Sequence, residues 1–300
     1  MREPAHRRGP DSAVHAVTLR TLGREYRLWA KHPATAEAFA FLDSVPEMPG
    51  RELEVINLEV EGAGPTFRMK LPDGSVGRGS REALINEFMR ALGHFVEGET
   101  LASPILHAAT ASWRGVRGVF LGNRAFGKTT LMLRLLSEGF AVEGDELVVV
   151  GAEEAIVMPR RLHVKAGALP FVRQLAAAIR SSPSIRSEDD SPIYAVTPSI
   201  GGLPWRIEAG AIDHLYFIEP NHGGQSTVAP LKGDDAFGRL VCEAVMPTRR
   251  KGEAAARLRA TALNSRCWSF GLGELDDAVL QLRRTFAKAN VAESLPEGRA

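Results

Sequence analysis

Apolar and polar residues alternate strictly in the first quarter of the chain. Residues 56–60 (INLEV) carry an apolar side chain at every second position, and residues 67–71 (FRMKL) repeat the pattern after a Gly-Ala-Gly-Pro turn. A period of two places the apolar side chains on one face of a strand. The pattern therefore predicts a β-hairpin, which the Asp73-Gly74 turn extends into a meander.

Helical spacing flanks these strands. Residues 35–42 predict a short helix before them, and Ser80 is a typical N-cap for a longer helix that runs to about Gly93. The apolar residues that support the longer helix are Leu84, Phe88, Ala91 and Leu92. We therefore expect a small α+β domain over residues 14–98, preceded by a polar, arginine-rich and disordered tail at residues 1–13.

The pattern changes in residues 99–300 to that of an α/β domain. Residues 116–121 form an apolar run typical of a buried strand, and residues 130–138 have helical spacing that ends at Gly139. The loop between them, GNRAFGKT, satisfies G-x-x-x-x-G-K-[ST]. This P-loop pattern places backbone N–H groups and a helix N-terminus around a triphosphate.

The P-loop defines a set of candidate nucleotide-binding residues. Lys128 would reach the β and γ phosphates, and the Thr129 hydroxyl would serve Mg²⁺. The full set is Gly122, Asn123, Arg124, Ala125, Phe126, Gly127, Lys128, Thr129 and Thr130. The alternative interpretation is a strand-to-helix turn bracketed by glycines, with a solvated lysine.

Two acids follow the P-loop helix. Phe140 and Val142 indicate a brief strand, after which Asp145 and Glu146 lead into the apolar residues 147–150. Beside a P-loop, one carboxylate can hold Mg²⁺ and another can accept the proton of an attacking hydroxyl, which makes a kinase possible. The alternative is a pair of acids in a solvated turn.

Composition narrows the class of protein. With 300 residues, 44% hydrophobic and 24% charged, the chain can bury a globular core. The formal net charge of +1 does not favour nucleic-acid binding, and no apolar run is long enough to span a membrane. The N-terminus lacks a secretory apolar segment, so we expect a cytoplasmic protein with Cys242 and Cys267 as buried, unpaired thiols.

The spacing of these motifs resembles that of the HPr serine kinase/phosphorylases, and more closely that of the HPr-kinase-related proteins of peptide-modification gene clusters. In that family a histidine lies fifteen residues before the first P-loop glycine, as His107 precedes Gly122 here. Two acids follow the P-loop lysine at seventeen and eighteen residues, as Asp145 and Glu146 follow Lys128. The resemblance is strongest over residues 101–165. It is weaker from there to the C-terminus, where strands and a last helix over residues 272–282 are expected to follow the general layout of the family.

The resemblance implies a P-loop kinase domain of the HPr kinase and phosphoenolpyruvate-carboxykinase type, which uses ATP and Mg²⁺ to phosphorylate a serine-type hydroxyl of a peptide or small protein. By analogy with the family, Asp145 would be the general base. Glu146 and Thr129 would hold the metal ion, Lys128 would act on the phosphates, and His107 would lie near the γ-phosphate or the base.

The sequence also departs from the family. Glu146 stands where the true HPr kinases have Asp, and Ala125 stands where many P-loops have glycine. The glycine-rich signature associated with phosphorolysis is replaced by MPRRLHVKAGAL at residues 158–169. We therefore expect neither phosphorolysis nor HPr as the substrate.

The parts that differ from the family are candidates for acceptor recognition. Arg160, Arg161 and Lys165 lie on a strand-like segment after the acids and would contact a phosphate or an acidic peptide, or be solvated. The polar stretch at residues 181–192 is expected to be a mobile loop that can act as a lid. Two other functions stay open: a regulatory protein that binds the nucleotide without transfer, and a kinase of a small molecule. The sequence gives no prediction of the oligomeric state.

Overall fold

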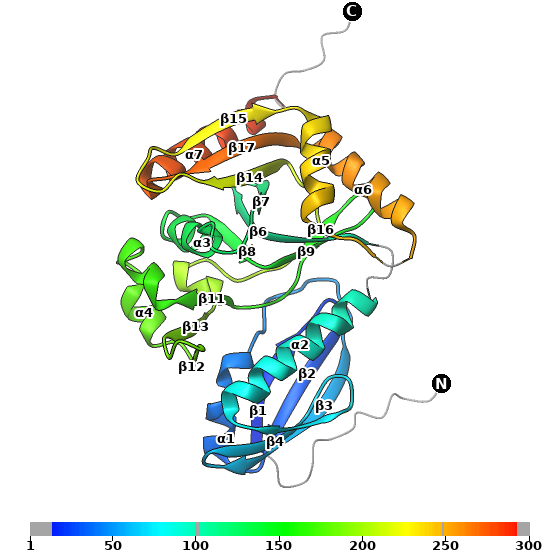
Figure 1. Cartoon of the computed structure of the whole chain (residues 1–300), viewed down its shortest axis with the longest axis vertical. Coiled ribbons are helices and arrows are strands. Elements are labelled where there is room, and N and C mark those ends of the chain that lie inside the picture. Colours follow the sequence, from blue (N-terminus) through cyan, green and yellow to red (C-terminus); the bar gives the residue numbers. More distant parts are fainter. Residues whose placement is uncertain (1–13, 100–102, 248, 293–300) are drawn as a thin grey trace, which may run out of the picture.

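The computed structural model describes residues 14–99, 103–247 and 249–292, and these residues form three β-sheets flanked by helices. Figure 1 shows the N-terminal sheet at one end of the molecule and the largest sheet at the other. The smallest sheet lies between them. The predicted disordered tail falls outside the described residues.

The N-terminal sheet has five strands in the order β1-β2-β3-β4-β5. Their bounds are β1 (Val14–Arg20), β2 (Arg24–Ala30), β3 (Glu54–Ala63), β4 (Thr66–Lys70) and β5 (Val76–Gly79). The pair β2–β3 is parallel and the other neighbours are antiparallel. The predicted hairpin is the β3–β4 pair, and the turn at Asp73-Gly74 joins β4 to β5 as expected.

Three helical segments accompany this sheet: α1 (Pro33–Ala38), the 3₁₀ segment η1 (Ala40–Leu42) and α2 (Arg81–Glu99). The Ser80 hydroxyl accepts a 3.2 Å hydrogen bond from the N–H of Ala83, so the predicted N-cap is confirmed. The predicted end at Gly93 was wrong. A glycine inside a helix costs only about 1 kcal/mol, and the helical hydrogen bonds on both sides of it outweigh that cost.

The largest sheet has nine strands, with the order β10-β9-β6-β7-β14-β17-β15 and with β8 and β16 both paired to β6. The bounds are β6 (Ile105–Trp113), β7 (Val116–Leu121), β8 (Ala141–Gly144), β9 (Leu147–Val150), β10 (Ala155–Val157), β14 (His214–Pro220), β15 (Thr227–Leu231), β16 (Ala244–Val245) and β17 (Arg266–Leu272). Strand β14 is parallel to both β7 and β17. The remaining pairs are antiparallel, so the sheet is mixed.

Helices cover both faces of this sheet. The helices are α3 (Lys128–Ser137), α7 (Leu275–Ala292), α5 (Gly233–Glu243) and α6 (Lys251–Asn264). Phe120 of β7 belongs to the core under α3 and α7, whereas its neighbours Val119 and Leu121 belong to the core under α5 and α6. Because every residue of β7 is buried, the strand is sandwiched between the two layers, which is an α/β arrangement.

The smallest sheet has the order β11-β13-β12, with β11 (Leu162–Lys165), β12 (Ser184–Arg186) and β13 (Pro192–Val196). Short helical segments η2 (Ala166–Phe171), α4 (Ala176–Arg180) and η3 (Pro198–Gly201) surround it. The expected loop at residues 181–192 was therefore wrong in part, because it contains β12 and the turn of a hairpin. Ile185 is buried against the N-terminal core and explains why this polar stretch is ordered into a strand.

Three further expectations need correction. The helix after the P-loop begins at Lys128 rather than at residue 130. The last helix was expected from residue 272 to 282 but runs over Leu275–Ala292, because residues up to Leu272 form β17. Cys242 is exposed, and only Cys267 is a buried thiol; neither is in a disulfide. In the described part of the chain, no helix is both long and apolar enough to cross a membrane.

Candidate functional site: a P-loop beside two acids

The P-loop connects β7 to α3, and its glycines are required by the backbone. Gly127 has φ 87°, in the left-handed region that favours glycine. A Cβ at Gly122 would lie 3.2 Å from the Cβ of Ile218, so this position also favours the absence of a side chain. Ala125 adopts φ 68°, which costs an alanine about 1 kcal/mol. The loop therefore keeps the left-handed turn at a position where glycine is absent.

The start of α3 presents unused hydrogen-bond donors. Within the described part of the chain, no hydrogen bond is donated by the backbone N–H groups of residues 127–130. The first N–H groups of a helix have no partner within it, and the helix dipole adds partial positive charge there. This geometry suits an anion such as a phosphate group.

Lys128 is folded back over the loop and buried, at 6% exposure. Its Nζ donates hydrogen bonds to the carbonyl oxygens of Gly122 and Asn123. Burial lowers the pKa of Lys128 from its ordinary value, and the carboxylates of Asp145, Glu243 and Glu146 oppose that shift. The ammonium group is thus held at the P-loop by backbone carbonyls, and the negative charges of three carboxylates act on it.

Asp145 lies in the turn between β8 and β9 and touches the P-loop helix. Thr129 Oγ1 donates a 2.6 Å hydrogen bond to Asp145 Oδ2. Burial raises the pKa of Asp145 to about 6; the Thr129 hydrogen bond opposes this shift, and the nearby Glu146 charge adds to it. A carboxyl group with a pKa close to neutrality can take up and release a proton at physiological pH.

Glu146 is engaged by the segment that follows β10. Arg160 Nη1 forms an ion pair with Glu146 Oε2, and Arg160 Nη2 contacts His163 Nδ1. Arg161 turns the other way and pairs with Asp43, with 2.8 Å between Nη2 and Oδ2. Lys165 is exposed at the end of β11. The three predicted acceptor cations therefore point to three different surroundings.

His107 lies on β6 close to the acids. It is opposite Leu147 of β9, and the next residue, Ala108, donates its N–H to the carbonyl oxygen of Glu146 at 3.0 Å. Burial lowers the pKa of His107 from its ordinary value, and Lys128 contributes in the same direction. His107 is therefore neutral at physiological pH and can accept or donate a hydrogen bond.

The structure adds one residue that the sequence motifs did not indicate. Glu243 ends α5, directly before Ala244, which pairs with Leu106 of β6. Burial raises the pKa of Glu243, while the charges of Lys128 and Arg239 oppose the shift. No local pattern marks this glutamate, because only the pairing of β16 with β6 brings it to the P-loop lysine.

The oxygen donors at this site fit Mg²⁺. The Thr129 hydroxyl and the Glu146 carboxylate supply hard oxygen atoms, and the carboxyl group of Asp145, which accepts the Thr129 hydrogen bond, lies beside them. Among the described residues, no group of three or more His, Cys, Asp or Glu side chains could hold a metal ion. Protein sites for Mg²⁺ use one or two carboxylates together with water and substrate phosphates, so a sparse ligand set is appropriate.

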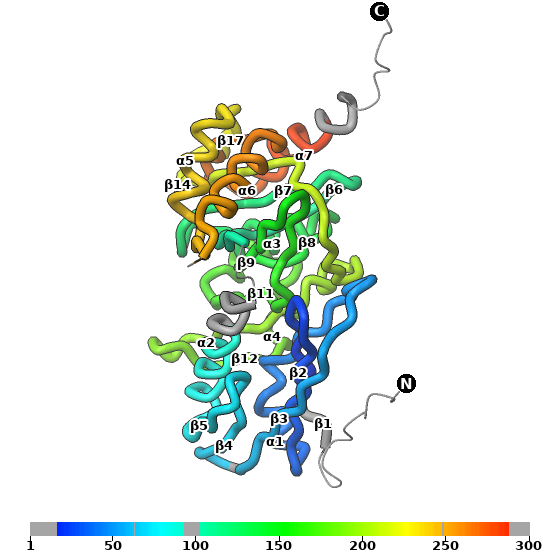
Figure 2. The backbone as a smooth tube through the Cα atoms, turned by 90° about the vertical axis from the view of Figure 1, so that its right-hand side faces the viewer, coloured from blue at the N-terminus to red at the C-terminus, as the bar shows by residue number. Residues whose placement is uncertain are grey.

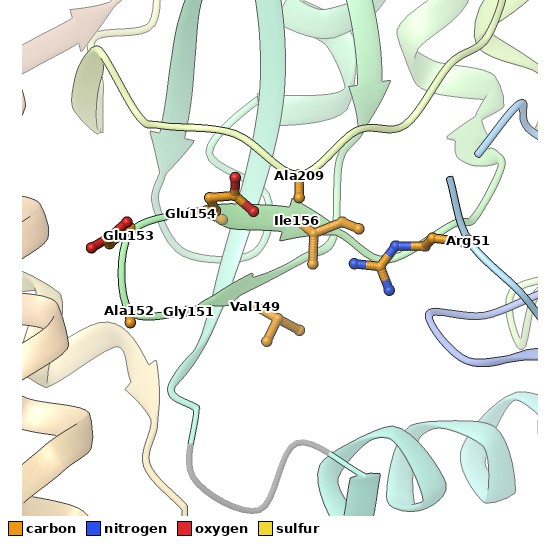
Figure 3. A pocket seen from close by; sticks show the side chains of 9 residues that line it. Arg51, Val149, Gly151, Ala152, Glu153, Glu154, Ile156 and Ala209 are labelled. Carbon is orange, nitrogen blue, oxygen red and sulfur yellow. The ribbon is translucent and has the colours of Figure 1, made fainter. Parts of the chain in front are cut away.

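A separate cavity of about 370 Å³ lies at the β9–β10 turn (Figure 3). Arg51 of the N-terminal region reaches toward it, and the carboxylate of Glu154 lies on the side of the β-turn. None of the residues that line it belongs to the P-loop or is one of the site acids. This cavity is therefore distinct from the candidate site.

Compared with family models and with curated proteins, the sequence matches none of them. The resemblance to the HPr kinases accordingly rests on the spacing of His107, the P-loop and the two acids. The structure brings Lys128, Thr129, Asp145 and Glu146 around one end of α3, with His107 on the strand next to them.

Proposed function

We propose that the protein is an ATP- and Mg²⁺-dependent kinase with a P-loop domain of the HPr kinase type, and that it phosphorylates a serine-type hydroxyl of a peptide or small protein. The observation that carries this proposal is the 2.6 Å contact between Thr129 and Asp145. It places a carboxyl group with a raised pKa beside the threonine of a P-loop. That pairing supports phosphoryl transfer more specifically than nucleotide binding alone.

The P-loop would hold the donor. The N–H groups of residues 127–130 would bind phosphate oxygens, and Lys128 would leave the carbonyls of Gly122 and Asn123 to pair with the β and γ phosphates. Thr129 and Glu146 would hold Mg²⁺, which when bound neutralises phosphate charge. Pre-positioned positive charge of this kind stabilises the transferring phosphoryl group.

Asp145 would then take up the proton of the serine-type hydroxyl that attacks the γ-phosphate. As the hydroxyl oxygen forms its bond to the γ-phosphorus, the bond to the β–γ bridging oxygen breaks and ADP leaves with that electron pair. The hydroxyl proton passes to a carboxylate oxygen of Asp145. His107, neutral and on the adjacent strand, would hydrogen-bond the γ-phosphate or the carboxylate.

One observation favours a second function, a regulatory protein that binds ATP without transferring phosphate. Glu146, which the family resemblance assigns to the metal ion, is paired with Arg160. The pair uses Glu146 Oε2; if Arg160 engaged both carboxylate oxygens in the nucleotide complex, the site would have one carboxylate fewer for Mg²⁺. Nucleotide binding would then be retained while transfer is slow.

The two functions are separated by one assay. The purified protein is incubated with radiolabelled ATP and Mg²⁺, and with the short peptide encoded nearest to its own gene, with HPr and with free serine as separate acceptors. The kinase proposal expects a gain of about 80 Da at one serine of the peptide, and no label on HPr or on serine. ATP binding with no labelled acceptor would favour the regulatory protein, and label on free serine would favour a small-molecule kinase.

A further inference from the structure

Arg160 lies between the N-terminal region and the candidate site. On one side its guanidinium group pairs with Glu146, and on the other it contacts the imidazole of His163. The planar fork of an arginine can serve two partners at once, so its direction is fixed by both of them. A contact that fixes the position of His163 therefore also fixes the guanidinium group of Arg160 beside Glu146.

The holder of His163 is the segment η1 of the N-terminal region. The ring of Phe41 lies 4.7 Å from the imidazole ring of His163, centroid to centroid. Arg161, the residue that follows Arg160, donates hydrogen bonds to the carbonyl oxygen of Ala40 at 3.3 Å and to the carboxylate of Asp43 at 2.8 Å. Residues 160–163 are thus held against η1 and Asp43 by three contacts.

The clamp is continuous with an apolar core. Phe41 is 3% exposed and belongs to the N-terminal core, which also contains Met158, Ile185 and Ala195 from the second part of the chain. Figures 1 and 2 both show β11 between the N-terminal sheet and α3. The N-terminal region therefore packs against the connection between β10 and β11 that carries Arg160, rather than lying apart from it.

We propose that the N-terminal region is part of the site's positioning apparatus, acting through the contact series Phe41, His163, Arg160 and Glu146, with Arg160 as the positioning residue for Glu146. The inference rests on the proposed function only in assigning Glu146 to the metal ion. The small α+β region would then help to position Glu146, a function that is separate from recognition of the substrate.

Glu146 needs such support because it lies in a turn. A glutamate side chain has three rotatable bonds, and an exposed ion pair alone holds it weakly. Arg160 is mostly buried, with 22% of its side chain exposed, and its second contact to His163 restricts it further. Residues that orient a metal ligand in this way typically change metal affinity by about 10- to 100-fold when they are lost.

Two matched variants test the series. Phe41→Leu removes the ring that packs on His163, whereas Phe39→Leu makes the same substitution two residues earlier, where the ring packs on Phe67 inside the N-terminal core. Amide hydrogen exchange is measured without nucleotide or metal in peptides that cover residues 141–150 and the N-terminal sheet. We expect Phe41→Leu to accelerate exchange in residues 141–150 by about three- to tenfold, and Phe39→Leu to leave it unchanged.

A second measurement follows the metal ion. The Mg²⁺ concentration that gives half-maximal binding of a fluorescent ATP analogue should rise about tenfold in Arg160→Lys, which keeps the charge but loses the fork. Phe41→Leu should raise it by a smaller factor, and adding Phe41→Leu to Arg160→Lys should change it little further. Additive effects of the two substitutions would show that Phe41 acts by another route.

The outcomes separate this inference from the kinase proposal. If the protein transfers no phosphate, the exchange difference between Phe41→Leu and Phe39→Leu still supports the positioning series. If it binds no nucleotide at all, the exchange measurement alone decides. Equal exchange in residues 141–150 for wild type, Phe41→Leu and Arg160→Lys would overturn the inference, even if the kinase proposal holds.

Discussion

Thr129 and Asp145 are joined by a 2.6 Å hydrogen bond, although Thr129 lies in the first turn of α3 and Asp145 lies in the turn after β8. The hydroxyl donates, so the carboxyl group is the acceptor in the structure. Burial at this place raises the pKa of Asp145 to about 6. The relationship combines a possible metal ligand with a group that can accept a proton near neutral pH.

Because its pKa is raised, ionised Asp145 destabilises the folded protein at neutral pH when no ligand is bound. Its folded-state pKa of about 6 exceeds the ordinary 3.8, so the folded state binds more protons between these values and becomes less stable as pH rises through them. Asp145→Asn stays neutral and still accepts from Thr129. We expect its free energy of unfolding at pH 7.5 to exceed that of wild type by about 3 kcal/mol, and the two to converge below pH 4, as measured by urea denaturation without ligands. An identical difference at both pH values would contradict this explanation.

Lys128→Met tests the phosphate cradle. The methionine keeps the apolar stem but loses the ammonium group that would stabilise the transferring phosphoryl group. We expect phosphoryl transfer to fall by about a hundred- to a thousandfold while the circular dichroism spectrum and melting curve stay close to wild type. Exposed Lys70→Met serves as the control. A well-folded Lys128→Met protein with near-normal transfer would remove the P-loop from the mechanism.

Asp145 and Glu146 should respond differently to metal. Asp145→Asn cannot accept the hydroxyl proton, so ATP should bind while transfer falls by about a hundredfold or more at any Mg²⁺ concentration. Glu146→Gln weakens a metal ligand, and raised Mg²⁺ should restore much of its activity. The check is the transfer rate of each variant over a Mg²⁺ titration. Equal rescue of both variants would show that the two roles are not divided in this way.

Local patterns predicted the parts of the site that are contiguous in sequence. Strand β7 was expected at its observed bounds, and Asp145 and Glu146 were expected at the start of β9, because a buried strand, a glycine loop and an apolar run each have a local signature. The structure gives Gly139 φ 83°, which agrees with the predicted end of α3.

The contacts that could not be predicted depend on tertiary pairing. The link from Glu146 through Arg160 to η1 requires β11 to lie against the N-terminal region, and Glu243 reaches Lys128 only because β16 pairs with β6. The last helix was misplaced because the alternating strand β17 precedes it without a strong turn signal. Long-range pairing of this kind leaves no periodic trace in either partner.

Acceptor recognition is expected to involve Lys165. It is the exposed one of the three cations proposed from the sequence, since Arg160 and Arg161 are engaged by Glu146 and Asp43. Lys165→Glu should raise the KM for an acidic peptide acceptor by about tenfold and leave the KM for ATP unchanged. Lys70→Glu on β4 is a matched charge reversal. Equal KM changes for peptide and ATP would place Lys165 outside the acceptor site.

A buried histidine far from the P-loop should set part of the pH dependence of stability. His214 is fully buried among the rings of Tyr216, Trp268 and Phe286, and its Nδ1 accepts a 2.8 Å hydrogen bond from Trp268 Nε1. Burial lowers the pKa of His214 to about 4, and the charge of Arg266 adds to the shift. Protonating Nδ1 would also break the bond from Trp268.

The sign of the effect follows from the two states of His214. The unfolded chain takes up this proton near pH 6.5, whereas the folded protein resists it until about pH 4, so stability falls as pH drops between these values, by about 3 kcal/mol from this group. His214→Asn can still accept from Trp268 but does not titrate, so its free energy of unfolding should change less over this range, although it is lower at pH 7 because of the lost ring. The exposed His222→Asn is the control and should keep the wild-type slope. Denaturation curves at pH 7, 5.5 and 4.5 give the free energy of unfolding of each variant. If that free energy fell with pH in His214→Asn as steeply as in wild type, the acid sensitivity would belong to other groups.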